Sequence, residues 1–197
     1  MLPKDIDPDS RCRLPNVKRD DMDDEGKAVY DQVVAPTGIN IRGLKGPGGI
    51  GLHSPRLAKV SRPVNRYLRA EAGLPPKVRE VAILATARQC DSQFEWAAHE
   101  PEALKEGVPM SVIDIIKHRK STTGLAEPDA FLIDLAREGF GARKVASETF
   151  ARGLKLFGAR QLLDIVVLMG NYAATAMMLA TFDMQLDEGQ PPLLPVP

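Results

Sequence analysis

The chain has 197 residues, a length that predicts one domain or at most two. Hydrophobic residues make up 44% of it, enough to fill a core and too many for a disordered chain. The 26 basic and 26 acidic residues balance, so charge gives no reason to expect nucleic acid or an anionic membrane as a partner. Two cysteines, Cys12 and Cys90, are too few for a disulfide framework. The N-terminal residues lack the features of a signal peptide, and we expect a soluble cytoplasmic protein.

The first third of the chain predicts an arm, a helix, a glycine-rich loop and a second helix. Residues 1–20 carry three prolines and read as an extended arm, and the acidic residues 20–24 supply an N-cap for a helix that Pro36 ends. Residues 37–53 hold six glycines and predict a loop whose backbone can lie close to a ligand, without the spacing of a dinucleotide-binding fingerprint. Ser54 and Pro55 then begin a helix towards Glu71, which Pro63 is expected to kink or split. Its apolar residues share one side: Leu57, Val60, Val64, Tyr67 and Leu68.

Apolar residues at helical spacing continue through the rest of the chain. They predict helices over 77–90, 93–106, 109–117, 128–138, 145–156 and 159–185, with an exposed loop over 118–127. No segment alternates as a strand does, so the predicted fold class is all-α, with about eight helices and no sheet. The expected organisation is an arm (1–20), a single helical domain (21–186) and a proline-rich tail (187–197), which is either disordered or docked on a neighbour.

The segment from Ile165 to Phe182 contains no charged residue and approaches the length of a membrane span. No Lys/Arg cluster marks a cytoplasmic side, and small residues such as Gly170 and Ala173 suit close packing between helices. A helix that is apolar all round is buried either in lipid or in protein. We expect a central or subunit-interface helix rather than a membrane span.

Two acidic residues and one histidine are the candidates for chemistry. His99 follows Glu95 by four residues, so both side chains lie on one helix face. Such a pair can hold the imidazole in one tautomer and raise its pKa, which suits an acid/base group. The alternative is an exposed polar pair that contributes about 0.2–0.5 kcal/mol. Two ligands do not complete a zinc site, so no metal is expected. His118 stands at a helix end before two cations, which predicts a structural role.

Glu80 is the third candidate, because it stands in a helix otherwise built for burial. An unpaired buried carboxylate is costly, so Glu80 either faces solvent or is held against a partner. The nearby cations are Arg79 and Arg88.

Two stretches, Leu74–Arg88 and Phe94–Gly107, resemble the carboxymuconolactone decarboxylase family of the alkylhydroperoxidase D-like superfamily. The motif that carries the resemblance is Arg-Glu followed by Glu-Trp-x-x-His. Three shorter segments add to it, and the similarity covers about residues 22–186: Val29-Tyr30-Asp31, Leu52-His53-Ser54-Pro55 and Gly170-Asn171-Tyr172.

The resemblance implies an alkylhydroperoxidase D-like helical bundle that forms homotrimers or hexamers and acts on a small molecule without a cofactor. In the peroxidase relatives a Glu precedes a Cys-x-x-Cys pair and a His. Glu80 and His99 match that Glu and His, but Ser92 and Glu95 stand at the two cysteine positions. A disulfide-based peroxidase is therefore disfavoured.

The decarboxylase-like branch fits better and implies a lyase that removes CO2 from an unsaturated lactone acid, in the catabolism of aromatic compounds. His99 is then the acid/base group, Glu95 its orienting partner and Glu80 a second carboxylate that handles protons. Two alternatives stay open: an oxidoreductase that uses Cys90 alone, and a non-catalytic helical oligomer that binds a small ligand. The candidates for substrate contact are His53, Arg79, Arg88, Trp96, Asn171 and Tyr172.

Overall fold

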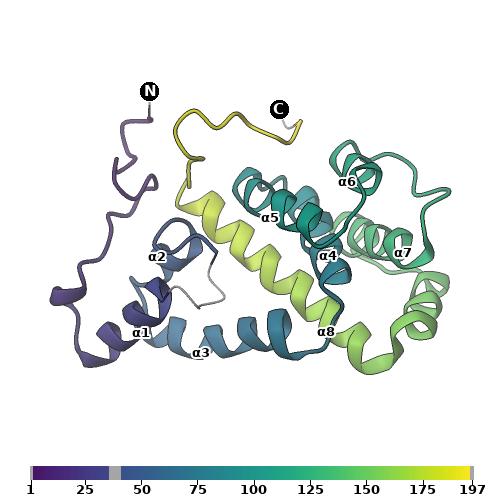
Figure 1. Ribbon diagram of the computed structural model, residues 1–197, viewed down its shortest axis with the longest axis horizontal. Coiled ribbons are helices and arrows are strands. Elements are labelled where there is room, and N and C mark those ends of the chain that lie inside the picture. The colour runs from purple at the N-terminus through teal and green to yellow at the C-terminus, as the bar shows by residue number, and fades with distance from the viewer. Residues whose placement is uncertain (1, 36–40, 196–197) are drawn as a thin grey trace.

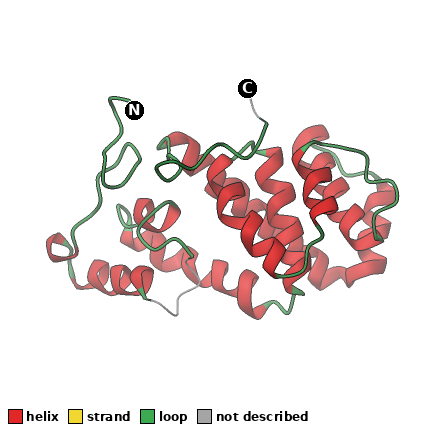
Figure 2. Ribbon diagram, turned by 45° about the horizontal axis from the view of Figure 1, so that its top comes forward, coloured by secondary structure: helices red, strands yellow, loops and turns green. Residues whose placement is uncertain are grey.

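The computed structural model describes residues 2–35 and 41–195, and over these residues the protein is built from helices and loops without a strand (Figures 1 and 2). The predicted all-α class is confirmed, with eight α-helices in the described part of the chain. The first is α1 (Asp24–Val34), and the side chain of its N-cap residue, Asp23, accepts a hydrogen bond from the Gly26 N–H at 2.7 Å. This is the acidic cap that the sequence predicts. The predicted stop at Pro36 lies outside the described residues.

The glycine-rich segment contains a short helix, α2 (Pro47–Gly51), where the sequence predicts only a loop. Gly46 precedes it with φ of 74°, in the left-handed region that favours glycine. A Cβ on Gly46 would also collide with the ring of Phe94. Glycine at this position therefore lets the start of α2 pack against the start of α5 (Gln93–Lys105).

The next helix, α3 (Pro55–Arg66), passes through Pro63 and continues into a π-helical turn, η2 (Tyr67–Glu71). Of the predicted kink or split at Pro63, the split is therefore wrong: the helix continues, and its hydrogen-bond register changes at Tyr67. The apolar side of this helix does not form core as its pattern suggests. Leu68 is buried, but the other four residues are exposed by 39–65% of their surface: Leu57, Val60, Val64 and Tyr67.

The core is centred on α4 (Pro76–Gln89), which packs against α5, α7 (Glu127–Ala136) and α8 (Ser147–Thr181). A shorter helix, α6 (Met110–Lys117), also packs on α4, and a π-helical turn, η3 (Arg137–Ala142), extends α7. Because α4 is enclosed on all sides, its residues 80–88 are all buried. Large side chains from the four helices fill the core: Ile83, Leu84, Trp96, Phe131, Ile165 and Leu168.

The long helix α8 runs diagonally through the helical body of the molecule (Figure 1). It is broken at Gly158, whose φ of 68° and ψ of 169° are not helical, at the place where the sequence predicts two helices. In the described chain α8 is the one helix long and apolar enough to cross a membrane, and its most apolar window is 44% buried in the protein. Ile165 and Leu168 belong to the core, which places α8 inside the fold as predicted.

The arm and the tail both dock on the body of the same chain. In the arm, the Arg13 N–H donates to the Phe182 carbonyl at 2.8 Å, and the Gln185 N–H donates to the Arg11 carbonyl at 2.9 Å. In the tail, the side-chain oxygen of Gln93 accepts from the N–H groups of Leu193 and Leu194, each at 3.0 Å. Leu194 is 4% exposed. The described part of the tail is therefore held against its own chain by these contacts.

Candidate active site

The site is built around His99, which α5 holds against α4. The turn between the two helices reverses the chain at Asp91, whose φ is 48°, and it is closed by the Ser92 N–H donating to the Ala87 carbonyl at 2.9 Å. Glu80 on α4 and His99 on α5 therefore lie side by side, although 19 residues separate them in sequence. His99 Nδ1 is 2.8 Å from Glu80 Oε2, and both side chains are almost fully buried.

Glu80 is held as an ionised group from two directions. His99 contacts its Oε2, and Arg79 Nε donates to its Oε1 at 3.0 Å. Arg79 is itself fixed, because its Nη1 donates to the Arg69 carbonyl at 2.8 Å. Burial raises the pKa of Glu80, but the hydrogen bonds and charges of His99 and Arg79 outweigh it, so the pKa of Glu80 lies below its usual value.

Glu95 stands on the other side of the imidazole. Its Oε2 is 3.6 Å from His99 Nε2, and the residue is 4% exposed. Burial raises the pKa of Glu95 above its usual value, with the charges of His99 and Arg69 opposing the shift only in part. Relative to an ordinary glutamic acid, the surroundings therefore stabilise the neutral form at Glu95 and the carboxylate at Glu80.

The two carboxyl groups together fix the tautomer of His99. An ionised Glu80 can only accept, so Nδ1 of His99 donates its hydrogen to Oε2 of Glu80. Nε2 then faces Glu95 and can exchange a proton with it. Tyr172 of α8 closes this side, with its ring edge-on to the imidazole at a centroid distance of 5.1 Å. Burial also raises the pKa of Tyr172, so its hydroxyl keeps its proton.

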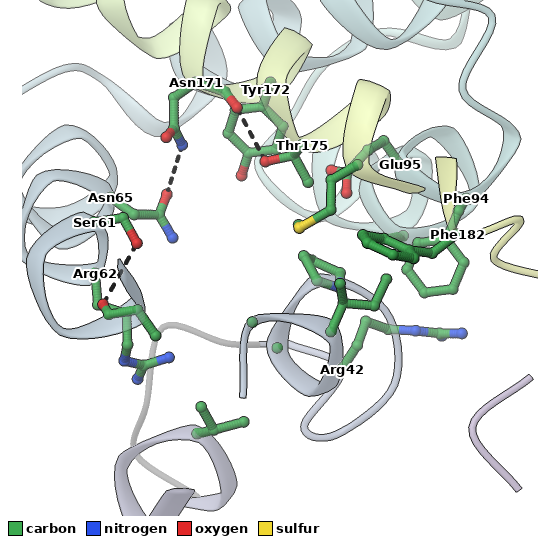
Figure 3. Close-up of a pocket in the computed structure, with 18 of the residues that line it drawn as sticks. Arg42, Ser61, Arg62, Asn65, Phe94, Glu95, Asn171, Tyr172, Thr175 and Phe182 are labelled. Carbon is green, nitrogen blue, oxygen red and sulfur yellow. Dashed lines mark hydrogen bonds between the residues drawn. The ribbon is translucent and has the colours of Figure 1, made fainter. Parts of the chain in front are cut away.

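A cavity of about 400 Å³ opens beside Glu95 and His99, between α2, α3, α5 and α8 (Figure 3). Of the residues predicted for substrate contact, Asn171, Tyr172 and His53 line it. The His53 ring lies nearer the surface, where Nε2 is 2.9 Å from the Pro15 carbonyl of the arm. The structure thus brings five predicted residues to one cavity wall: His53, Glu95, His99, Asn171 and Tyr172.

The other candidates do not reach the cavity. Glu80 and Arg79 lie behind His99, so Glu80 can act on a substrate only through the imidazole. Arg88 lies two turns further along α4, where its Nε donates to the Lys117 carbonyl at 2.7 Å and its Nη1 pairs with Asp91. Arg88 therefore does not line this cavity.

Trp96 is also absent from the cavity. It follows Glu95 directly, and one residue turns the helix by about 100°. The ring is completely buried in the core, and its Nε1 donates to Glu100 Oε2 at 3.1 Å. Trp96 therefore belongs to the core and does not line this cavity.

Several polar residues that line the cavity were not predicted from the sequence, among them Arg62, Asn65 and Arg69. These three come from α3 and η2, at spacings of three and four residues, which place side chains on one helix face. That spacing is the signal that could have revealed them. The apolar residues of the same segment predicted which side is buried, but they do not indicate which polar residues line the cavity.

Cys90 lies apart from this cavity and lines a second one, beside the tail. Burial and the neighbouring Asp91 raise the pKa of its thiol. A redox-active cysteine needs the thiolate, so this environment disfavours the peroxidase-like alternative. Among residues 2–35 and 41–195, no group of three or more His, Cys, Asp or Glu side chains is arranged to hold a metal ion.

The fold and the site define an all-helical protein with a buried Glu–His–Glu array at the wall of a cavity. Residues 55–133, from the start of α3 into α7, match the model of the Carboxymuconolactone decarboxylase family. The matched segment carries Glu80, Glu95 and His99, and the match agrees with the resemblance seen in the sequence. No curated protein and no solved structure gave a significant match to the chain.

Proposed function

We propose that the protein is a cofactor-independent lyase that removes CO2 from a carboxylated lactone or a related carbonyl compound. The observation that carries this proposal is the pair of carboxyl groups on either side of His99, which have opposite pKa displacements. General acid catalysis needs a group that holds a proton and a second group that restores it. Glu95 supplies the proton at the cavity wall, and His99, held by Glu80, can return one to it.

The proposed reaction needs only these residues and a substrate whose conjugated carbonyl can take up the electron pair of the broken bond. The bond between the carboxylate carbon and the ring breaks, and its electron pair moves into the conjugated carbonyl as a dienolate. Glu95 then gives its proton to a carbon of the dienolate, CO2 leaves, and solvent reprotonates Glu95 through His99. The largely apolar wall favours loss of the charged carboxylate because it lowers the local dielectric.

Arg69 supports this assignment from the cavity wall. Its charge acts on both Glu95 and Tyr172, which places the guanidinium near the proton donor. A cation at this position can hold the substrate carbonyl as negative charge develops on it. We assign Arg69 this role in place of Arg88.

The direct test is release of CO2 from γ-carboxymuconolactone and related unsaturated lactone acids by the purified, metal-free protein. We expect release by the wild type and a loss of at least about 100-fold in His99→Gln, the lower limit for removal of an acid/base group. The matched control is His118→Gln, because His118 is an exposed histidine on α6 whose ring faces Asp114. Release of CO2 by neither the wild type nor the control would reject the decarboxylase and leave the ligand-binding alternative.

We also propose that the protein assembles with copies of itself. One side of α8 exposes a continuous row of apolar or small residues, and α3 exposes another apolar row, with no charge in either set: Leu163, Val166, Val167, Gly170, Ala174 and Met177 on α8, and Leu57, Val60 and Val64 on α3. An exposed apolar surface of this kind is typical of an interface between proteins. The homotrimer or hexamer implied by the family resemblance would cover it.

Light scattering on a sizing column tests the assembly. We expect a multiple of the 21.5 kDa chain for the wild type and a shift to smaller mass for Val167→Glu, with Lys155→Glu on the same helix as the control. A monomeric wild type would contradict the proposal. A wild type that stays in solution only with detergent would point to a membrane instead, and would also contradict the expected cytoplasmic location.

A further inference from the structure

The cavity beside His99 has two chemically different ends (Figure 3). Polar side chains of α3 and α8 form one end, where Ser61, Arg62, Asn65 and Asn171 lie. Aromatic and aliphatic side chains form the opposite end, and Glu95 lies between the two. The apolar end is formed by four lining residues that pack in one hydrophobic cluster: Ile50, Phe94, Met178 and Phe182.

The polar end is built to receive hydrogen-bond acceptors. Asn171 Nδ2 donates to Asn65 Oδ1 at 3.3 Å, which ties α8 to α3. This bond orients the Asn65 amide so that its NH2 group faces the cavity (Figure 3). Arg62 is anchored by its Nη2, which donates to the Gln32 carbonyl of α1 at 3.0 Å. With Arg69 nearby, this end offers two guanidinium groups and an amide donor to a carboxylate or carbonyl.

The apolar end stays apolar although an arginine lines it. Arg42 Nη2 binds Asp187 Oδ2 at 2.6 Å, and Lys45 Nζ binds the other oxygen of Asp187 at 2.8 Å. The Arg42 guanidinium also lies over the Phe94 ring, 5.3 Å from its centroid. Its charge is therefore compensated at the rim, and Figure 3 shows the guanidinium directed away from the cavity.

We infer that the substrate is an amphipathic acid, with a carboxylate or carbonyl head at Asn65 and Arg69 and an alkyl or aryl tail between Phe94, Met178 and Phe182. The inference rests on the proposed function for the head and adds the tail. A volume of about 400 Å³ lies within the usual range of ~300–1,000 Å³ for sites that bind drug-sized molecules. A bare lactone acid placed at Glu95 would leave the apolar end to water, which cannot hydrogen-bond to such walls.

Binding of straight-chain carboxylates to the whole protein tests the inference without relying on catalysis. Isothermal titration calorimetry with butanoate, hexanoate, octanoate and decanoate should show affinity rising with chain length, by up to about fourfold per methylene while the tail enters the apolar end. 1-Decanol should bind more weakly than decanoate, because it lacks the charge that the two arginines recognise. Affinity that is independent of chain length, or equal for decanol and decanoate, would overturn the inference.

Two methionines provide a matched pair of variants. Met178 lines the cavity, whereas Met110 is 58% exposed at the start of α6 and lines neither the cavity nor the apolar rows of α3 and α8. Met178→Trp should fill the apolar end and weaken decanoate binding at least about tenfold while leaving butanoate binding nearly unchanged. Met110→Trp should bind both as the wild type does, and equal decanoate binding by the two variants would contradict the inference.

The two proposals fail in different ways. Release of CO2 from γ-carboxymuconolactone without any effect of chain length would support the lyase and overturn the amphipathic substrate. An effect of chain length, with no CO2 released from any acid tried, would support the shape of the ligand and reject the decarboxylase.

Discussion

The two sides of His99 show how partners, rather than burial, decide the charge of a carboxyl group. Glu80 on α4 is 1% exposed and Glu95 on α5 is 4% exposed, so both have lost nearly all contact with water. Glu80 accepts hydrogen bonds from His99 and Arg79, and its pKa falls. Glu95 has its nearest His99 nitrogen at 3.6 Å, and its pKa rises. Glu80 thus anchors the imidazole on one side, and on the cavity side the surroundings of Glu95 stabilise its neutral form relative to an ordinary glutamic acid.

The largest expected effect is the loss of turnover when Glu95, on the cavity side of His99, is replaced. Glu95→Gln keeps the shape of the side chain and removes the acidic proton, so turnover should fall by about 100- to 10,000-fold. The measurement is kcat for CO2 release from whichever lactone acid the wild type accepts. Near-normal kcat in Glu95→Gln would show that the proton comes from another group, with Tyr172 the next candidate at the wall.

The anchoring side should show the larger effect on stability. Glu80→Gln leaves Arg79 without its carboxylate partner in a largely buried position, which should cost about 3 kcal/mol of unfolding free energy, the lower end of the range for breaking a buried ion pair. Urea unfolding at neutral pH measures it. The control is Glu102→Gln, which removes a surface pair with Lys105 and should change stability by less than about 0.5 kcal/mol. Equal losses of unfolding free energy in the two variants would contradict an anchoring role for Glu80.

The pH dependence of stability should have opposite signs on the two sides. The pKa of Glu95 is raised by folding, so its stabilising effect relative to Glu95→Gln is greatest below the ordinary value of 4.5 and is lost as pH rises through the folded pKa. The pKa of Glu80 is lowered, so its effect relative to Glu80→Gln is present above 4.5 and is lost as pH falls through the folded pKa.

Urea unfolding of the wild type and both variants over a pH series measures these trends. Each unit of pKa displacement corresponds to about 1.4 kcal/mol. Curves for the two variants that shift in the same direction with pH would contradict the assignment of charges.

The smallest effect is expected at Cys90, which has no role in the proposed reaction. Cys90→Ser should change stability by less than about 0.5 kcal/mol, as exposed substitutions usually do, and should leave CO2 release unchanged. Activity assays and urea unfolding on the same preparation measure both. A large loss of turnover would revive the oxidoreductase alternative despite the raised thiol pKa.

Local signals in the sequence predicted most of the fold. Proline and glycine mark the helix ends well, as at Pro55 and at Gly158, whose left-handed backbone divides α8 as expected. The glycine-rich segment misled the prediction, because Gly46 is required by contact with Phe94, a residue distant in sequence. The apolar side of α3 was expected to be buried in the core but is exposed. An apolar stripe has the same sequence pattern whether its own chain or a partner covers it.

The candidate site residues that lie together on one helix could be predicted from the sequence. Contacts between residues of different helices could not. The spacing of Glu95 and His99 predicts that they share one face of α5. The sequence left open whether Glu80 faces solvent or a partner, and the packing of α4 on α5 provides His99 as that partner. Arg88 and Arg69 could not be told apart from sequence. Which arginine reaches the cavity depends on how α4 and η2 are oriented around it.

The central claim is that Glu95 holds a proton at pH values where Glu80 has lost its own. Infrared difference spectroscopy over a pH series measures it directly, because a protonated carboxyl group has its own C=O stretching band. We expect a band that persists to higher pH than that of an ordinary glutamic acid, disappears in Glu95→Gln and survives in Glu102→Gln. A persistent band that is unchanged in Glu95→Gln, or lost in Glu80→Gln alone, would contradict it.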